Sequence, residues 1–422
     1  MPKITQILAR EIIDSRANPT IETCIALDNG LSAKASVPSG ISTGKDEAFE
    51  LRDQDQSRFN GMGVQKAVGI INSELSTRLR GMEATNQAEI DRTLLVLDGT
   101  DNKAKLGANT TLSISIAACK VAAQCYRYPT YRYIAALMGR DITAEHGKPS
   151  PMFNLINGGK HGAGNLDFQE FLIVPSQAIP FHEALRAGCE IYLSLKEVLK
   201  HRNAIYSVGD EGGFAPNLFT NADALEVLMQ AITSAKYKLG EDIFLSLDVA
   251  ASHFIHGNAY GLKDRTAPLS RNEMIDYFKD VVTEYHLLSI EDALDENDWD
   301  GWKELTAVLG SNTLIVGDDL LVTNIKHLEQ AIQQKAANAI LVKPNQAGTV
   351  TETLQVVYRA KQANWETIVS HRSGETNDEF IADFAVGVGA GYAKFGAPAR
   401  GERVAKYNRL LEIESERGMN RG

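Results

Sequence analysis

The pattern of apolar and polar positions changes once along the chain, near residue 140. In the first part, apolar side chains largely alternate with polar ones over residues 20–27, and the turn residues 28–30 follow, which predicts a half-buried strand. Apolar stripes at helical spacing come next and predict three helices, at 64–79, 90–97 and 111–124. Strands followed by a run of helices predict a small α+β domain over residues 1–138.

The second part has a different rhythm, in which short apolar runs alternate with amphipathic helical stretches. A polar, turn-rich segment at 139–150 precedes it. Apolar runs separated by helices are typical of parallel strands that are buried on both faces. The expected strands are 152–156, 170–174, 205–208, 243–247, 287–290, 313–316, 339–342, 367–369 and 392–393. The expected helices include 182–199, 222–235, 272–282 and 350–361.

This alternation extends over about 270 residues and matches a (β/α)8 barrel, whose usual size is roughly 250 residues. Two expected strands precede the first long helix, which predicts an irregular ββαα opening. We therefore expect an α/β protein in which a barrel at 139–422 follows the smaller α+β domain.

Composition narrows the class of protein. The 43 basic and 54 acidic side chains give a net charge of −11, which disfavours binding to nucleic acid or to anionic lipid. No apolar run approaches the ~18–20 residues that span a bilayer, and the N-terminus lacks the apolar stretch of a signal peptide. The four cysteines have no zinc-like spacing. We expect a cytoplasmic protein with free thiols, no membrane span and no nucleic-acid partner.

A polar or charged residue follows each of the last six apolar runs. These residues are Asp248, Glu291, Asp318, Lys343, His371 with Arg372, and Lys394. A single acidic residue after a strand is commonly the N-cap of the next helix, but lysine is a poor cap. Because barrel enzymes place their chemistry at the C-terminal ends of the strands, the set predicts an active site at one mouth of the barrel.

The residue types at this mouth indicate the chemistry. Asp248, Glu291 and Asp318 offer hard oxygen ligands, which favour a divalent cation such as Mg²⁺. Lys343, Arg372 and Lys394 form a cationic half that favours an anionic substrate carrying phosphate, carboxylate or both. Arg372 followed by Ser373 suits phosphate, and a buried lysine among cations can act as a neutral general base.

Two further carboxylates and several glycine-rich segments lie near expected strand ends. Glu211, in the loop 209–213, and Glu170 suggest acid–base work beyond metal binding. The glycine-rich segment 156–165 predicts an active-site loop. Segment 39–46 disfavours a P-loop NTPase, because only three residues separate Gly40 from Gly44 and Asp46 follows Lys45.

Motifs along nearly the whole chain, from residue 3 to about 413, resemble the enolase family. They are Asp14-Ser15-Arg16, Ser39-Gly40-Ile41-Ser42-Thr43-Gly44, Leu106-Gly107-Ala108-Asn109, the segment 209–218 (Gly-Asp-Glu-Gly-Gly-Phe-Ala-Pro-Asn-Leu), Ser289-Ile290-Glu291-Asp292, the segment 370–376 (Ser-His-Arg-Ser-Gly-Glu-Thr), Lys394-Phe395-Gly396-Ala397-Pro398 and Ala405-Lys406-Tyr407-Asn408. The resemblance implies the reversible dehydration of 2-phospho-D-glycerate to phosphoenolpyruvate, a step of glycolysis.

The resemblance also implies a role for each site residue. It places one Mg²⁺ on Asp248, Glu291 and Asp318, and a second, arriving with substrate, on Ser42. It makes Lys343 the base and Glu211 the acid. The implied substrate-binding residues are His161, Glu170, His371, Arg372, Ser373 and Lys394. A small phosphorylated substrate and a homodimer or larger homo-oligomer are further implications.

The sequence departs from the family pattern in a few places and leaves alternatives open. Ala17 stands where the family usually has Gly, and Ile41 replaces Ala in the mobile loop; Ser113 and Gly401 also depart. One alternative is another enzyme of the superfamily, such as an acid-sugar dehydratase or racemase, although Asp210-Glu211 at an early strand end favours enolase chemistry. The other is an additional scaffold or binding role, with a pool at the cell surface or outside the cell.

Overall fold

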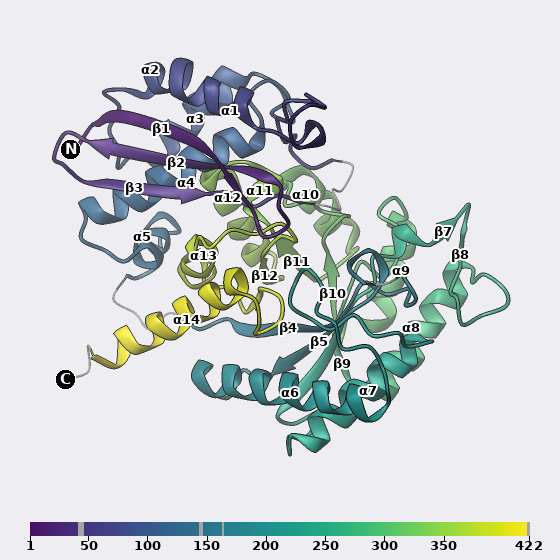
Figure 1. Ribbon diagram of the computed structural model, residues 1–422. Helices are drawn as coiled ribbons and strands as arrows, with labels where there is room; N and C mark the ends of the chain where they lie inside the picture. The colour runs from purple at the N-terminus through teal and green to yellow at the C-terminus, as the bar shows by residue number, and fades with distance from the viewer. Residues whose placement is uncertain (41–45, 143–146, 163, 420–422) are drawn as a thin grey trace.

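The computed structural model describes residues 1–422 except 41–45, 143–146, 163 and 420–422. Ser42 and Ile41, which carry two of the expectations above, lie outside the described residues. Two structural parts follow each other along the chain: a three-stranded sheet with its helices, and a closed barrel ringed by helices (Figure 1).

The N-terminal part is an antiparallel sheet covered by helices. Its strands pair in the order β1 (Ile4–Ile13), β2 (Pro19–Leu27), β3 (Ser32–Ser36). A 3₁₀ turn (Phe59–Gly61) precedes helices α1 (Gln65–Ile70), α2 (Ser76–Leu79), α3 (Gln87–Asp98), α4 (Ala108–Cys125) and α5 (Thr130–Leu137). A π-helical segment (Ile71–Leu75) joins α1 to α2, so the helix expected at 64–79 is present with one wider turn.

Eight strands close the barrel, and the expected α/β fold is confirmed. In chain order they are β4 (Ser150–Asn157), β5 (Glu170–Pro175), β6 (Ile243–Asp248), β9 (Leu287–Glu291), β10 (Leu314–Gly317), β11 (Ala339–Val342), β12 (Glu366–Ser370) and β13 (Tyr392–Lys394). The closed order is β10-β11-β12-β13-β4-β5-β6-β9. The sequence division at residue 138 stays a prediction; α5 ends at Leu137 and β4 begins at Ser150.

The barrel opens irregularly because one strand runs against the others. β5 pairs antiparallel with both β4 and β6, whereas the remaining neighbours are parallel. Two helices separate β5 from β6, so the opening is ββαα as expected. The helices after β5 are α6 (Phe181–His201), α7 (Asn221–Ser234), α8 (Arg271–Tyr285), α9 (Trp299–Leu309), α10 (Ile325–Gln334), α11 (Pro344–Ala347), α12 (Val350–Gln362), α13 (Phe380–Val388) and α14 (Gly401–Met419). A small hairpin, β7 (Ile255–His256) with β8 (Ala259–Tyr260), and 3₁₀ turns at Gly159–His161 and Ala251–His253 complete the elements.

The strand expected at 205–208 was wrong. This segment lies on the surface between α6 and α7, with Ile205 49% and Val208 45% exposed. Tyr206 rests beneath the ammonium groups of Lys196 and Lys200, at 5.9 and 5.7 Å from its ring centre. Because β5 pairs directly with β6, the barrel has no open edge that this apolar run could join.

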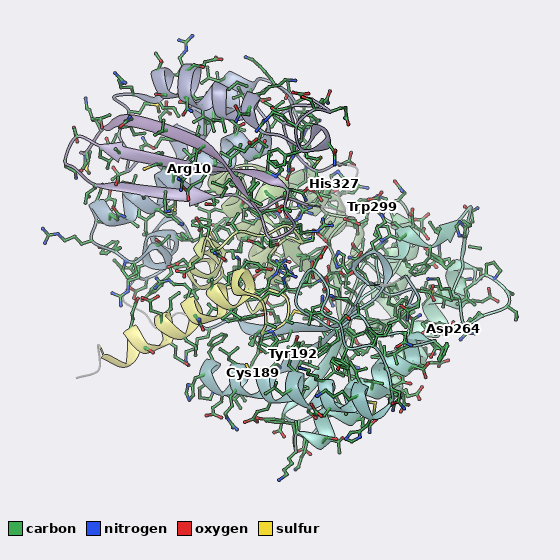
Figure 2. All side chains as sticks on the ribbon, in the orientation of Figure 1. Arg10, Cys189, Tyr192, Asp264, Trp299 and His327 are labelled. Carbon is green, nitrogen blue, oxygen red and sulfur yellow. The ribbon has the colours of Figure 1, made fainter. Side chains whose placement is uncertain are left out.

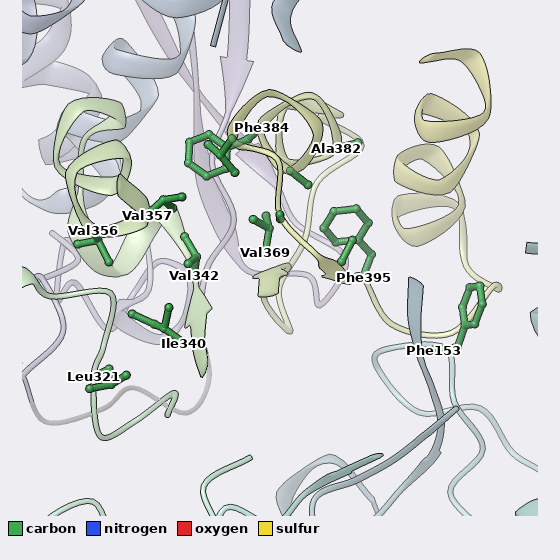
Figure 3. Close-up of a cluster of buried hydrophobic side chains, with 14 of the residues drawn as sticks. Phe153, Leu321, Ile340, Val342, Val356, Val357, Val369, Ala382, Phe384 and Phe395 are labelled. Atoms are coloured by element: carbon green, nitrogen blue, oxygen red, sulfur yellow. The ribbon is translucent and has the colours of Figure 1, made fainter. Parts of the chain in front are cut away.

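The core lies in two layers. Inside the barrel, side chains from several strands form one buried cluster: Met152, Leu172, Val174, Val316, Ala339, Leu341, Ile368 and Tyr392. Between the barrel and the helices, Ile340 and Val342 belong to a second cluster with Val356 and Val357 of α12 (Figure 3). Alternation along β11 therefore places Leu341 inside and its two neighbours outside, as barrel geometry requires. Among the described residues, no helix has the length and apolarity needed to cross a membrane.

Candidate active site

The strand register brings acidic residues from three strands to one end of the barrel. Glu170, the first residue of β5, pairs with Asp248, the last residue of β6, and Asp248 pairs with Glu291 at the end of β9. Because β5 is antiparallel, its beginning lies at the same barrel end as the C-terminal tips of its neighbours. Strand direction therefore explains how Glu170 joins the site.

Lys394 lies between these three carboxylates. Its Nζ is 3.0 Å from Asp248 Oδ2, 2.8 Å from Glu291 Oε2 and 3.0 Å from Glu170 Oε2. Burial alone would lower the pKa of Lys394, but the three carboxylates raise that pKa well above its usual value. Burial, together with the charge on Asp248, raises the pKa of Glu291 well above its ordinary value. The lysine therefore stays charged and holds the acidic group together.

Lys343 and Asp318 form a second ion pair at the mouth. Its ammonium forms an ion pair with Asp318, and Gln346 Nε2 donates to the other Asp318 oxygen at 3.1 Å. Burial opposes the charged form of Lys343, but Asp318 raises the pKa of Lys343, while Arg372 and Lys394 act in the lowering direction. Lys343 is thus an ammonium in this structure, and its partner Asp318 controls that state.

Arg372 presents a planar fork that is occupied by a carboxylate. Its Nη1 lies 2.9 Å from Glu47 Oε2 and its Nη2 lies 3.2 Å from Glu47 Oε1, and Nη1 also donates to Asn345 Oδ1 at 3.1 Å. Arg372 and Ser373 are buried, at 4% and 6% exposure. A bidentate contact of this kind can also hold phosphate oxygens, so Glu47 marks the place of an anion.

His161, Glu170 and Glu211 form a buried group of titratable side chains at the mouth. His161 Nδ1 lies 3.2 Å from Glu170 Oε1 and 3.7 Å from Glu211 Oε1. Burial would lower the pKa of His161, but Glu211 and Glu170 raise it to about 9. Burial and the Glu211 charge raise the pKa of Glu170 to about 7. Burial acts in the same direction on Glu211, but His161, His371 and Arg403 hold the pKa of Glu211 well below its ordinary value. Glu170 therefore takes up a proton more readily than Glu211 does.

The loop that carries Glu211 is held in place by contacts with α6. Tyr192 lies on α6 (Figure 2), and its hydroxyl donates to the Gly212 carbonyl at 2.9 Å. The Tyr192 ring stacks on Phe214 with ring centres 4.6 Å apart. On the other side, Arg16 Nε lies 2.7 Å from Asp210 Oδ2. The N-terminal part and α6 thus both position the segment around Glu211.

Several residues that touch this mouth were not predicted from the sequence: Glu47, Asn345, Gln346 and Arg403. Glu47 lies just after the glycine-rich segment 39–46, and Asn345 and Gln346 closely follow Lys343, so proximity in sequence was an available signal for these three. Arg403 lies on α14, 31 residues beyond Arg372 in sequence, and nothing in its local pattern distinguishes it from a surface arginine.

The acidic residues of the mouth could hold a divalent cation. Glu291 Oε1 is buried without a hydrogen-bond partner among the described residues, and such an oxygen suits a hard cation. A tight group of oxygens with metal-binding separations also forms between Asp292, Asp318 and Asp319. In that group both Asp292 oxygens already accept hydrogen bonds, from the backbone N–H groups of Asp318 and Asp319 at 3.0 and 2.9 Å. The unpartnered oxygen therefore favours a cation position beside Glu291 over one beside Asp292.

Comparison with protein families places this geometry in context. The model of the enolase N-terminal domain matches residues 4–134, and the model of the enolase C-terminal TIM barrel domain matches residues 145–421. The chain belongs to the enolase family. Members of the enolase family use divalent metals, so the acidic mouth and the family agree on a metal-dependent lyase of the enolase superfamily that acts on a small substrate.

Proposed function

We propose that the chain is a phosphopyruvate hydratase that converts 2-phospho-D-glycerate reversibly to phosphoenolpyruvate and water. The observation that supports this most directly is the division of the mouth into two chemistries. Lys343 and Arg372 form a cationic side, and Glu170 and Glu211 form an acid–base side next to the acidic group held by Lys394. A substrate with phosphate, carboxylate and a hydroxyl on adjacent carbons uses all of these groups.

The cationic residues bind and orient the substrate. Arg372 and Ser373 hold the phosphate, which replaces Glu47 on the guanidinium fork. Lys394 faces the substrate carboxylate, where negative charge builds up as the α-proton leaves. His161 and His371 line the pocket beside Glu211, within 3.7 and 3.5 Å of its oxygens.

Lys343 removes the α-proton and therefore must first lose its own. Arg372 and Lys394 both disfavour its ammonium form, and Asp318 opposes them. When bound, Mg²⁺ held by Asp248, Glu291 and Asp318, with a second ion at Ser42, would stabilise the carboxylate charge of the substrate. Glu211 then gives a proton to the departing hydroxyl. This step is needed because hydroxide is a poor leaving group. His161, which lies 3.7 Å from Glu211 Oε1 and 3.2 Å from Glu170 Oε1, is the group from which Glu211 can take up that proton.

Deuterium exchange into the α-carbon separates the two proposed roles. Lys343→Ala should abolish both exchange and phosphoenolpyruvate formation, because no carbanion forms. Glu211→Gln should block dehydration by at least the ~10²–10⁴-fold that one positioned acid contributes, while exchange remains measurable. Lys103→Ala is a matched control, because Lys103 is a buried lysine whose ammonium lies 2.9 Å from Glu352, a residue with no role in the proposed reaction. We expect this variant to keep both rates.

The same assay can contradict the assignment in two ways. Native exchange in Lys343→Ala, together with none in Glu211→Gln, would mean that base and acid are reversed. Absence of turnover on 2-phosphoglycerate in the unmodified protein, with and without Mg²⁺, together with proton exchange in another α-hydroxy or acid-sugar substrate, would assign the chain to a different reaction of the superfamily. The compartment and the oligomeric state stay predictions.

A further inference from the structure

The imidazole of His371 lies between two side chains of opposite charge, Arg403 and Glu211. Its Nδ1 lies 2.8 Å from Arg403 Nη1, and its Nε2 lies 3.5 Å from Glu211 Oε2. All three side chains are buried: those of His371 and Glu211 are 3% exposed, and Arg403 is 0% exposed. Water therefore has little access to either ring nitrogen, and the protein groups decide where the proton resides.

Arg403 determines which tautomer fits. A guanidinium can only donate hydrogen bonds, so Nδ1 must accept and the ring hydrogen must sit on Nε2. The opposite tautomer would bring two N–H groups together at Arg403 and would turn a bare lone pair toward the Glu211 carboxylate. Burial and the Arg403 charge also lower the pKa of His371 to about 3, which excludes the doubly protonated ring at neutral pH.

Arg403 is itself fixed by the two loops that it joins. Its Nη1 donates to the Arg372 carbonyl at 2.6 Å, and its Nη2 donates to the carbonyls of Ser373 at 2.6 Å and Asp210 at 3.2 Å. These carbonyls belong to residues within two positions of His371 or Glu211 in the chain. The guanidinium therefore sets the relative position of the two side chains as well as the tautomer of one of them.

Gly396 leaves the room that this arrangement needs. A Cβ at Gly396 would lie 3.0 Å from His371 Cε1, 3.2 Å from Arg403 Cδ and 2.6 Å from the Glu211 carbonyl. The φ of Gly396 is +85°, a conformation that also favours glycine. A glycine at position 396 is thus needed for Arg403 and His371 to lie this close to the Glu211 backbone.

We propose that Arg403 is a positioning residue that holds His371 as the neutral Nε2–H tautomer facing Glu211. The proposal rests on the proposed function, in which Glu211 is the acid. Glu211 Oε2 also accepts from Asn154 Nδ2 at 3.0 Å, so both N–H groups point at this oxygen. They leave Oε1, on the side of His161, as the oxygen that carries the transferred proton. α14 thereby controls the acid without reaching the substrate.

The tautomer can be measured without any activity. In the full protein labelled with ¹⁵N-histidine, the shifts of His371, assigned by comparison with His371→Gln, distinguish a protonated from a bare ring nitrogen. We expect protonated Nε2 and bare Nδ1 in the unmodified protein, and a mixture of tautomers or a charged ring in Arg403→Met. Bare Nε2 in the unmodified protein, or an unchanged spectrum in Arg403→Met, would overturn the proposal.

A double-mutant cycle tests whether the tautomer affects catalysis. Alanine in place of His371 removes the ring whose tautomer Arg403 sets, so His371→Ala serves as the second background. We expect Arg403→Met to lower kcat about 10–100-fold with His371 present, and less than about threefold in the His371→Ala background, with KM changing little in both. Equal losses in the two backgrounds would show that Arg403 only supports the loops.

Further variants keep these tests decisive. Arg403→Lys retains the charge and a donor, so we expect it to keep protonated Nε2 and bare Nδ1 on His371. Arg403→Ala replaces Arg403→Met in both experiments if the latter does not fold by circular dichroism. Arg400→Met removes a neighbouring arginine that contacts the carbonyls of Ser15 and Gly209, at 3.1 and 3.5 Å, but not His371. We expect it to leave the His371 spectrum unchanged. An inactive protein with the expected tautomer would refute the proposed function and leave the role of Arg403 intact.

Discussion

Replacing Lys394 with Met should make the stability of the protein strongly dependent on Mg²⁺. The ammonium of Lys394 lies 2.8–3.0 Å from the carboxylates of Glu170, Asp248 and Glu291, and each of the four side chains is at most 5% exposed. Methionine keeps most of the apolar length of the side chain but leaves three buried acidic groups without their cation.

The size of the effect follows from burial. Removing one partner of a buried ion pair costs about 3–5 kcal/mol, because the remaining charge stays desolvated. Because the pKa values of Glu170 and Glu291 are already raised, these groups can take up protons, which limits the loss to about the lower value at neutral pH. In Lys394→Met, a cation bound by Asp248 and Glu291 is no longer repelled by the positive charge of Lys394. A tenfold gain in Mg²⁺ affinity would return about 1.4 kcal/mol more than in the unmodified protein.

The assay is chemical unfolding followed by circular dichroism, in EDTA and in saturating Mg²⁺. Lys406→Met is the matched control, because Lys406 is also buried and pairs with Glu375 at 2.9 Å, but it contacts none of the proposed metal ligands. We expect both variants to lose stability in EDTA and only Lys394→Met to recover more than the unmodified protein does on addition of Mg²⁺. Equal recovery in all three proteins would refute the placement of the cation beside Lys394.

Two further predictions concern pH and backbone strain. The pKa of His161 in the folded protein, about 9, lies above its ordinary value of 6.5, so its contribution to stability is complete below pH 6.5 and is lost as pH rises through about 9. Urea titrations should show the unmodified protein losing about 3 kcal/mol more than His161→Gln over this range, and parallel curves would contradict the pairing. Ala17 has φ 60°, which costs an L-residue about 1–2 kcal/mol, partly offset by the greater freedom of unfolded glycine. Ala17→Gly should therefore raise the free energy of unfolding by about 0.5–1 kcal/mol, and a decrease of that size would show that the turn does not strain the alanine.

Much of the fold could be predicted from local pattern because each element carries its own signal. The helix at 64–79 is present as α1, the π-helical segment and α2, and eight of the nine expected barrel strands exist. The exception, 205–208, has the apolar content of a strand, but strand formation needs a pairing edge, and β5 and β6 close the barrel without it. A sequence pattern reports what a segment can do and not whether a partner is available.

The site divides in the same way. By itself the sequence determined that acidic residues, Lys343, Arg372 and Lys394 follow successive strands, because the residue after a strand is encoded next to it, and parallel strands carry such residues to one end. Only the tertiary structure decided which charges meet. Glu170 enters the mouth because β5 runs in reverse, Glu47 fills the fork of Arg372 from 325 residues away, and Arg403 on α14 sets the proton on His371. These contacts join segments that are distant in sequence, and their chemistry depends on burial and on strand direction, which no local pattern encodes.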